Sequence, residues 1–394
     1  MDQIDRKRNG MPKTAAVLGA TGSVGRQALD VARHADIKVD LLTANSDTRG
    51  METLAREFLP SYCVMADEAA AKELRTHLAD TEICVLGGAS ALTEAIARSK
   101  AETVVNAVLG AAGLAPTLAT IDAGKRLALS NKESLVVAGE LVMARAREKK
   151  AEIIPVDSEH SAIFQSLQAG RASEVRNLWL TASGGPFFGR SRAELERVTL
   201  SQTLAHPTWK MGAKITVDSA DMMNKGFEVI EAVHLFGVAP SKVRVVVHRE
   251  SIIHSAVEYI DGAVIAEMSL PDMRMCVQYA LSYPERATGV CAPLDLAAMG
   301  SLHFAPPDSE NFPLLPLAFR AVEEGGALPA VLNAANEVAV AAFLHEKLSF
   351  LGIGELVGET VDRLSSARKA HTLEEILDYD GEARRTAQSL LPEK

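Results

Sequence analysis

The stretch AAVLGATGSVG, residues 15–25, decides the fold. A short apolar run leads into Gly19, Gly22 and Gly25, and a segment with apolar residues at helical spacing follows. Glycines let a backbone approach a pyrophosphate closely, and the free N–H groups of a helix N-terminus attract an anion. We therefore predict a βα turn that binds a dinucleotide. A tight turn without a ligand is the alternative that these residues alone leave open.

Further β-rich runs follow at regular intervals, with helical segments between them. With the first run they cover residues 15–19, 38–44, 62–66, 82–87, 102–108, 126–130 and 152–156. This alternation predicts an α/β fold with a doubly wound, Rossmann-like parallel sheet. Ligands bind at the carboxyl edge of the strands in such sheets, so the loops at that edge are the first candidates for a site.

The chain has 394 residues, more than the roughly 250–300 at which one core stops growing, so several domains are expected. We expect a central α/β catalytic domain with strands near residues 175–183, 242–251 and 263–269, and a C-terminal helical domain. The predicted division is a flexible extension at 1–13, a dinucleotide-binding domain at 14–156, the catalytic domain at 157–286, a linker at 287–310 and the helical domain at 311–394.

Charge and cysteine content restrict the partners and the compartment. The net charge of −10 disfavours nucleic acid and anionic membranes as partners, because both attract basic surfaces. The cysteines, Cys63, Cys84, Cys276 and Cys291, are scattered without a C-x-x-C pair, which favours a reducing cytoplasm. No apolar run is long enough for a membrane span, and the start lacks the pattern of a signal peptide.

The segment IIPVDSEHSAIF, residues 153–164, carries the first candidate metal ligands. If the backbone at Asp157–Glu159 is extended, both carboxylates project to the same side. Carboxylate oxygens suit Mg²⁺ or Mn²⁺. A helix-capping motif is the alternative for these residues.

The segment VDSADMMNKGFE, residues 217–228, supplies complementary groups. Helical spacing places Asn224, Lys225 and Glu228 on one face, where Glu228 becomes a third carboxylate. Ser219, with Asn224 and Lys225, offers the hydroxyl, amide and ammonium donors that a phosphate prefers. A solvated helix face is the alternative.

Three loops complete the candidate site. TASGGPF, residues 181–187, offers Ser183 and two glycines to a phosphate, and AHPTWKMGAK, residues 205–214, has the composition of a flap that covers a substrate. In the flap, a core tryptophan and a turn histidine are the alternatives. In NKES, Lys132 and Glu133 are expected at the sheet edge near a nicotinamide, with a capped helix and a surface lysine as the alternative.

Taken in order, eight motifs resemble the signature of the 1-deoxy-D-xylulose 5-phosphate reductoisomerase family. They are GATGSVG, NKES, PVDSEH, TASGGPF, HPTWKMG, VDSADMMNKGFE, SIIHS and SLPDMR. The similarity extends from Thr14 to the helical tail around LNAANEVAVAAF. It implies a homodimeric enzyme of the non-mevalonate isoprenoid pathway that converts 1-deoxy-D-xylulose 5-phosphate and NADPH to 2-C-methyl-D-erythritol 4-phosphate, with Mg²⁺ or Mn²⁺.

The resemblance also implies residue roles. The metal ligands are Asp157, Glu159 and Glu228. The substrate contacts are Lys132, Ser158, Glu159, Ser183, His206, Ser219, Asn224, Lys225 and Glu228. The catalytic group is Lys132, Glu159, His206, Trp209, Met211 and His254. The cofactor contacts are Gly19, Thr21, Gly22, Ser23, Val24, Asn45, Ser46, Asn131, Glu133, Gly212 and Met273.

The chain departs from the family pattern at three places: Asn45-Ser46-Asp47, where NADPH or NADH preference is decided, Lys210 in the flap, and Arg249-Glu250 after His248. Arg49 is a candidate partner for a 2′-phosphate. A phosphosugar dehydrogenase that leaves the carbon skeleton intact and a non-catalytic dinucleotide sensor remain the alternative functions.

Overall fold

A computed structural model describes residues 10–209 and 211–392. The chain forms two compact units. Unit 1 contains Met1–Ser134, Val142–Ser161 and Asp272–Pro293, and unit 2 contains Leu135–Leu141, Ala162–Pro271 and Leu294–Lys394. The five-part division expected from the sequence stays a prediction, and the units cut the chain at other places. Of the expected flexible extension, residues 1–9 lie outside the described part.

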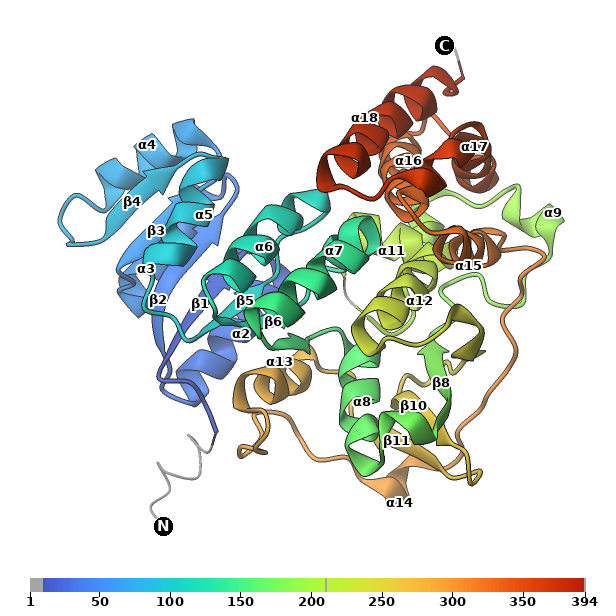
Figure 1. The fold of residues 1–394 in the computed structure, drawn as a ribbon, viewed down its shortest axis with the longest axis horizontal. Coiled ribbons are helices and arrows are strands. Elements are labelled where there is room, and N and C mark those ends of the chain that lie inside the picture. The colour runs from blue at the N-terminus through green and yellow to red at the C-terminus, as the bar shows by residue number, and fades with distance from the viewer. Residues whose placement is uncertain (1–9, 210, 393–394) are drawn as a thin grey trace. The chain divides into compact units, whose positions relative to one another are not determined.

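Unit 1 is built on a seven-stranded parallel sheet in the order β4-β3-β2-β1-β5-β6-β7 (Figure 1). The strands are β1 (Thr14–Leu18), β2 (Lys38–Ala44), β3 (Tyr62–Met65), β4 (Cys84–Gly87), β5 (Thr103–Asn106), β6 (Arg126–Leu129) and β7 (Ile153–Pro155). All seven predicted runs are strands, so the doubly wound sheet is confirmed. Strand order reverses between β1 and β5, where sheets of this kind bind dinucleotides.

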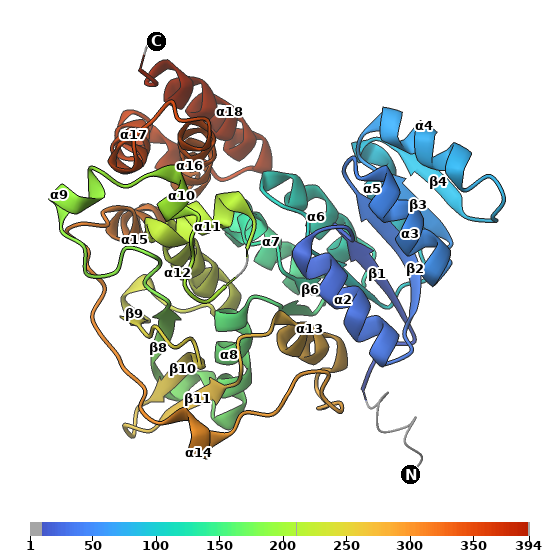
Figure 2. The ribbon, with the colours of Figure 1, turned by 180° about the vertical axis from the view of Figure 1, so that it is seen from behind.

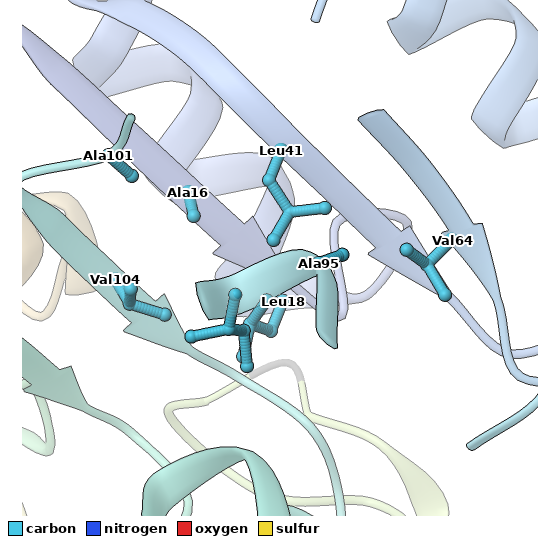
Figure 3. Close-up of a cluster of buried hydrophobic side chains, with 8 residues drawn as sticks. Ala16, Leu18, Leu41, Val64, Ala95, Ala101 and Val104 are labelled. Carbon is cyan, nitrogen blue, oxygen red and sulfur yellow. The ribbon is translucent and has the colours of Figure 1, made fainter. Parts of the chain in front are cut away.

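Helices connect these strands and bury their apolar faces on the sheet. The connecting helices are α2 (Ser23–His34), α3 (Thr48–Phe58), α4 (Glu68–His77), α5 (Ala89–Arg98), α6 (Leu114–Asp122) and α7 (Glu133–Lys149). Helix α8 (Ser158–Ser166) follows β7, and α13 (Met273–Ser282), later in the chain, contacts α2, β6 and β7. The boundary between the units falls inside α7 and α8. Leu18, Leu41, Val64 and Val104 from four strands pack with Ala95 of α5 (Figure 3). This core fixes the strand ends that carry the loops.

Unit 2 contains a four-stranded mixed sheet in the order β11-β10-β8-β9. Its strands are β8 (Val175–Ala182), β9 (Val243–Val247), β10 (Ile253–Tyr259) and β11 (Val264–Met268). β8 pairs with β9 in parallel, whereas β10 runs antiparallel to both β8 and β11. Three of these strands were predicted, and β10 was missed.

Helices form the remainder of unit 2, including the predicted C-terminal helical region (Figure 2). They are α9 (Arg192–Leu195), α10 (Leu200–Thr203), α11 (Ala213–Ala220), α12 (Met223–Phe236), α14 (Leu296–Met299), α15 (Leu314–Glu324), α16 (Leu328–Leu344), α17 (Phe350–Arg363) and α18 (Leu373–Ser389). Helix α16 is buried along most of its length and packs against α11, α15, α17 and α18. Among the described residues, none of the helices has the length and apolar character needed to cross a bilayer.

Candidate active site

The glycine turn of unit 1 has the geometry of a nucleotide-binding loop. Gly19 follows β1 with φ +74°, and a Cβ atom there would lie 2.5 Å from the Ala107 carbonyl oxygen. Gly25 approaches the Gly19 carbonyl so closely that a Cβ atom would lie 2.2 Å from it. Gly22 and Ser23 at the N-terminus of α2 are exposed. The turn therefore requires glycine and leaves its helix N-terminus accessible to an anion.

The end of β2 uses its acidic residue for local structure. Asp47 Oδ1 accepts a hydrogen bond from Gly50 N at 2.9 Å and caps α3. Asn45, Ser46 and Arg49 are exposed beside it. NAD-specific sites typically have a carboxylate in this region. Here one oxygen of the Asp47 carboxylate is engaged in the helix cap.

A buried ion pair joins the loops after β6 and β7. Lys132 Nζ contacts Asp157 Oδ2, and Asp157 Oδ1 lies 3.0 Å from His160 Nδ1. Burial opposes ionisation of Asp157, but the charges of Lys132 and His160 hold the pKa of its carboxyl well below the usual range. Lys132 is therefore not the surface lysine of the alternative interpretation. His160 was missed as a site residue, although its spacing of three from Asp157 was a usable signal.

Asp157 and Glu159 lie together for a different reason from the one predicted. The backbone is not extended, because α8 begins at Ser158. Carboxylate oxygens of Asp157 and Glu159 nevertheless lie within 4.8 Å of each other, and Ser158 Oγ donates to Glu159 Oε2. The first turn of the helix brings the two carboxylates together.

The Asn131 side chain is used within its own loop. Its amide donates to the carbonyl oxygens of Val108 and Gly110 at 2.8 and 2.9 Å and to Glu133 Oε2 at 3.0 Å. Its Oδ1 accepts from Ser134 N at 2.9 Å. Asn131 thereby holds the loop after β5 against the start of α7.

In unit 2, Ser183 and His206 form a hydrogen bond between the two predicted loops. His206 Nδ1 accepts from the backbone N–H groups of Thr208 and Trp209 at 3.1 and 2.9 Å. Its Nε2 therefore carries the proton and donates to Ser183 Oγ, 2.9 Å away. Burial lowers the pKa of His206, which keeps the ring neutral. His206 both shapes its turn and reaches the candidate phosphate site.

The candidate phosphate-binding residues of α11 and α12 lie beside the Ser183 loop. Gly185 packs so closely that a Cβ atom would lie 2.7 Å from the Ser219 carbonyl oxygen. On α12, Asn224 Nδ2 donates to Glu228 Oε1 at 2.6 Å, and Lys225 Nζ contacts Glu228 Oε2. Lys225 and Glu228 are 4% and 1% exposed, so the solvated-face alternative is wrong.

The remaining predicted residues have identifiable positions. Trp209 is partly buried and its ring centroid lies 6.2 Å from that of the buried His254 on β10. Met211 is partly buried and Gly212 is the N-cap of α11. Met273 begins α13 in unit 1. Trp209 is thus not the core tryptophan of the alternative interpretation, and Lys210 lies outside the described residues.

The departure after β9 has a structural role. Glu250 Oε1 lies 2.6 Å from His303 Nδ1, and Arg249 stacks on the Phe188 ring at 5.3 Å. His248 is stacked on Phe304 at 4.9 Å. These residues tie the segment after α14 to the end of β9.

Comparison with known proteins agrees with this arrangement. Three family models match: 1-deoxy-D-xylulose 5-phosphate reductoisomerase over residues 15–139, its C-terminal domain over 153–236, and DXP reductoisomerase C-terminal domain over 268–386. Reductoisomerases of this name from Phocaeicola vulgatus and Chlorobium chlorochromatii are 47% and 50% identical over 97% and 96% of this chain and 100% of each relative.

Solved structures are similar over almost the same length. The reductoisomerase from Zymomonas mobilis in complex with NADPH has a TM-score of 0.90 and 43% identity, covering 96% of this chain and 99% of that one. A DOX-P reductoisomerase in complex with NADPH, fosmidomycin and magnesium has a TM-score of 0.92 and 39% identity, covering 96% and 98%. The chain belongs to the 1-deoxy-D-xylulose 5-phosphate reductoisomerase family.

Proposed function

We propose that the protein converts 1-deoxy-D-xylulose 5-phosphate and NADPH to 2-C-methyl-D-erythritol 4-phosphate, as a step of non-mevalonate isoprenoid synthesis. The observation that carries the proposal is the Lys132–Asp157 ion pair beside Glu159, in a chain that matches curated relatives of the family over their whole length. A dehydrogenase that leaves the skeleton intact needs no such carboxylate pair.

The proposed metal ligands are the carboxylates of Asp157, Glu159 and Glu228. The donor set fits the ion, because Mg²⁺ and Mn²⁺ prefer hard carboxylate oxygens, and the charges beside Asp157 hold the pKa of its carboxyl well below the usual range. The bound metal supplies Lewis acidity for the carbon–carbon rearrangement, and NADPH supplies the hydride. Lys132, Ser158 and Glu159 orient the polar backbone of the sugar.

NADPH binds at the carboxyl edge of the unit 1 sheet. The close approach of Gly19 to Ala107 and the exposed N-terminus of α2 fit a pyrophosphate. Thr21 and Val24 flank this turn, and Asn131, Glu133, Gly212 and Met273 complete the cofactor contacts. Arg49, with Asn45 and Ser46, receives the 2′-phosphate, since Asp47 is engaged in capping α3.

The phosphate of the substrate binds to Ser183, His206, Ser219, Asn224 and Lys225. The fit rests on the Ser183–His206 hydrogen bond and on the packing of Gly185 against Ser219. The segment from His206 to Gly212 closes over the bound sugar, with Trp209 and Met211 covering it and His254 behind Trp209. Closure excludes water from the aldehyde intermediate.

The protein acts as a homodimer, and β11 is the proposed contact. This strand ends the unit 2 sheet, and Val264, Ile265 and Met268 on it are 55%, 40% and 36% exposed. An exposed apolar edge strand pairs readily with another strand. Light scattering of wild type and Ile265→Lys tests this proposal, and a monomeric wild type contradicts it.

The free cysteines are consistent with a cytoplasmic enzyme.

The activity is tested by following oxidation of NADPH or NADH with 1-deoxy-D-xylulose 5-phosphate and MgCl₂. We expect oxidation that EDTA abolishes and that is faster with NADPH. Oxidation that persists in EDTA contradicts the metal site, and faster oxidation of NADH contradicts the role given to Arg49. Absence of oxidation in a folded sample that binds dinucleotide favours the sensor.

A further inference from the structure

The turn between α11 and α12 is backbone-strained and buried. Met222 has φ +69° and is 5% exposed. A left-handed conformation is unfavourable for a residue with a Cβ atom, so surrounding contacts must hold it. The proposed phosphate ligands Ser219 and Asn224 lie on either side of this turn.

Asp218 supplies such contacts from the last turn of α11. It is 2% exposed, and Lys214 Nζ lies 2.8 Å from its Oδ2. Asn336 of α16 donates to its Oδ1 at 2.7 Å. The Lys214 ammonium also lies 4.9 Å from the Phe227 ring centroid on α12. Asp218 thus connects α11 to the C-terminal helices through a charge-assisted hydrogen bond.

Asp221 completes the turn as a neutral group. Its Oδ1 accepts from Met223 N at 3.0 Å at the start of α12. Burial, and then the charge of Asp218, raise the pKa of Asp221 well above its usual value. Asp218 thus lies between two side-chain donors, Lys214 and Asn336, whereas Asp221 accepts from a backbone N–H group.

We propose that Asp218, held between Lys214 and Asn336, is a positioning residue that fixes the phosphate-binding turn. A shift at this end of α11 moves Ser219 directly. It also moves the Ser183 loop, because Gly185 packs against the Ser219 carbonyl. The C-terminal helices, which themselves supply none of the proposed ligands, thereby set the affinity for the phosphate end of the substrate. The inference rests on the proposed function of these ligands.

The test compares Asn336→Leu with Asn333→Leu. Both asparagines lie on α16 and are 0% exposed, but Asn333 donates to Glu337 of its own helix at 3.3 Å. We expect Asn336→Leu to raise KM for 1-deoxy-D-xylulose 5-phosphate and the inhibition constant of inorganic phosphate about tenfold. The turnover number should stay within about twofold, because the reacting carbons are not contacted. Asn333→Leu should leave KM, the inhibition constant of inorganic phosphate and the turnover number near their wild-type values. The two variants should have similar thermal stability.

A swapped pair provides rescue. In Asp218→Asn with Asn336→Asp, the new amide can accept from Lys214 and donate to the new carboxylate, so phosphate affinity should return toward wild type. Asp218→Asn alone should lose affinity, because Lys214 and Asn336 then meet a neutral amide instead of making charge-assisted hydrogen bonds to a carboxylate. Equal effects of Asn336→Leu and Asn333→Leu, or an unchanged inhibition constant for phosphate in Asn336→Leu, overturn the inference.

Failure of the proposed function is recognised separately. If the wild type does not turn over the sugar, titration of inorganic phosphate followed by phosphorus NMR replaces the kinetic readout. Weaker phosphate binding by Asn336→Leu than by Asn333→Leu then supports the positioning role of Asp218. Equal binding by the two variants overturns it.

Discussion

Lys132 and Asp157 form a buried ion pair at the carboxyl ends of the neighbouring strands β6 and β7. Their side chains are only 10% and 13% exposed. Replacing Lys132 by Met leaves a buried carboxylate without its main counter-charge. We expect a loss of about 3–5 kcal/mol in the free energy of unfolding, measured by urea denaturation, and loss of turnover.

Lys149→Met is the control for this substitution. Lys149 lies 3.9 Å from Glu148 on the exposed side of α7, where an ion pair contributes at most about 1 kcal/mol. Similar losses for the two variants contradict the importance assigned to the Lys132–Asp157 pair.

The pH dependence of stability should carry a contribution from His206. The folded-state pKa of His206 is below the ordinary 6.5 because of burial. At pH values between the folded-state pKa and 6.5, the unfolded state therefore binds more protons than the folded state. The contribution is fully present above pH 6.5 and is lost as the pH falls toward the folded-state pKa. We expect the free energy of unfolding, measured by urea denaturation across this pH range, to depend less steeply on pH in His206→Gln than in wild type. The same pH dependence of stability in both proteins would contradict a neutral His206 ring in the folded state.

Asp221→Asn should stabilise the protein at neutral pH. The folded-state pKa of Asp221 is raised above 3.8 by burial and by Asp218. Above pH 3.8 the unfolded state loses a proton that the folded state keeps, so stability falls as the pH rises. The amide removes this cost, and we expect a gain of about 1–3 kcal/mol at pH 7 that vanishes near pH 3. A destabilised variant at pH 7 contradicts the neutral carboxyl.

Gly19→Ala should abolish dinucleotide binding. The new methyl group meets both a left-handed backbone and the Ala107 carbonyl oxygen. Gly189→Ala is the matched control, because Gly189 has φ +79° and nothing within 4 Å of its added Cβ. The control should lose only about 1 kcal/mol of stability. Fluorescence titration with NADPH measures the difference, and normal binding by Gly19→Ala contradicts the proposed pyrophosphate site.

Local patterns were sufficient to predict the sheet of unit 1, because each strand is a short apolar run ending in small or polar residues. β10 was missed because SIIHS was interpreted only as a motif, although the apolar alternation continues to Tyr259. The extended backbone expected at Asp157–Glu159 was wrong, because Ser158 begins a helix immediately after the strand end.

The sequence patterns could not predict contacts between residues that are far apart in the chain. Asn336 lies 118 residues from Asp218, and none of the candidate site residues was placed in the helical tail, whose pattern shows only apolar spacing. Burial of Lys225 and Glu228 was equally invisible, since alternating charges at helical spacing are also typical of a solvated face. Packing of α12 in unit 2 distinguishes the two possibilities.

The central claim is a rearrangement of the carbon skeleton together with a reduction. Proton NMR of the product formed from 1-deoxy-D-xylulose 5-phosphate, NADPH and MgCl₂ tests it most directly. The account predicts a methyl singlet at the chemical shift of a methyl group on a hydroxyl-bearing carbon. The signal is a singlet because that carbon of the branched product bears no hydrogen. A methyl doublet, from an unbranched polyol phosphate reduced at the ketone, would contradict it.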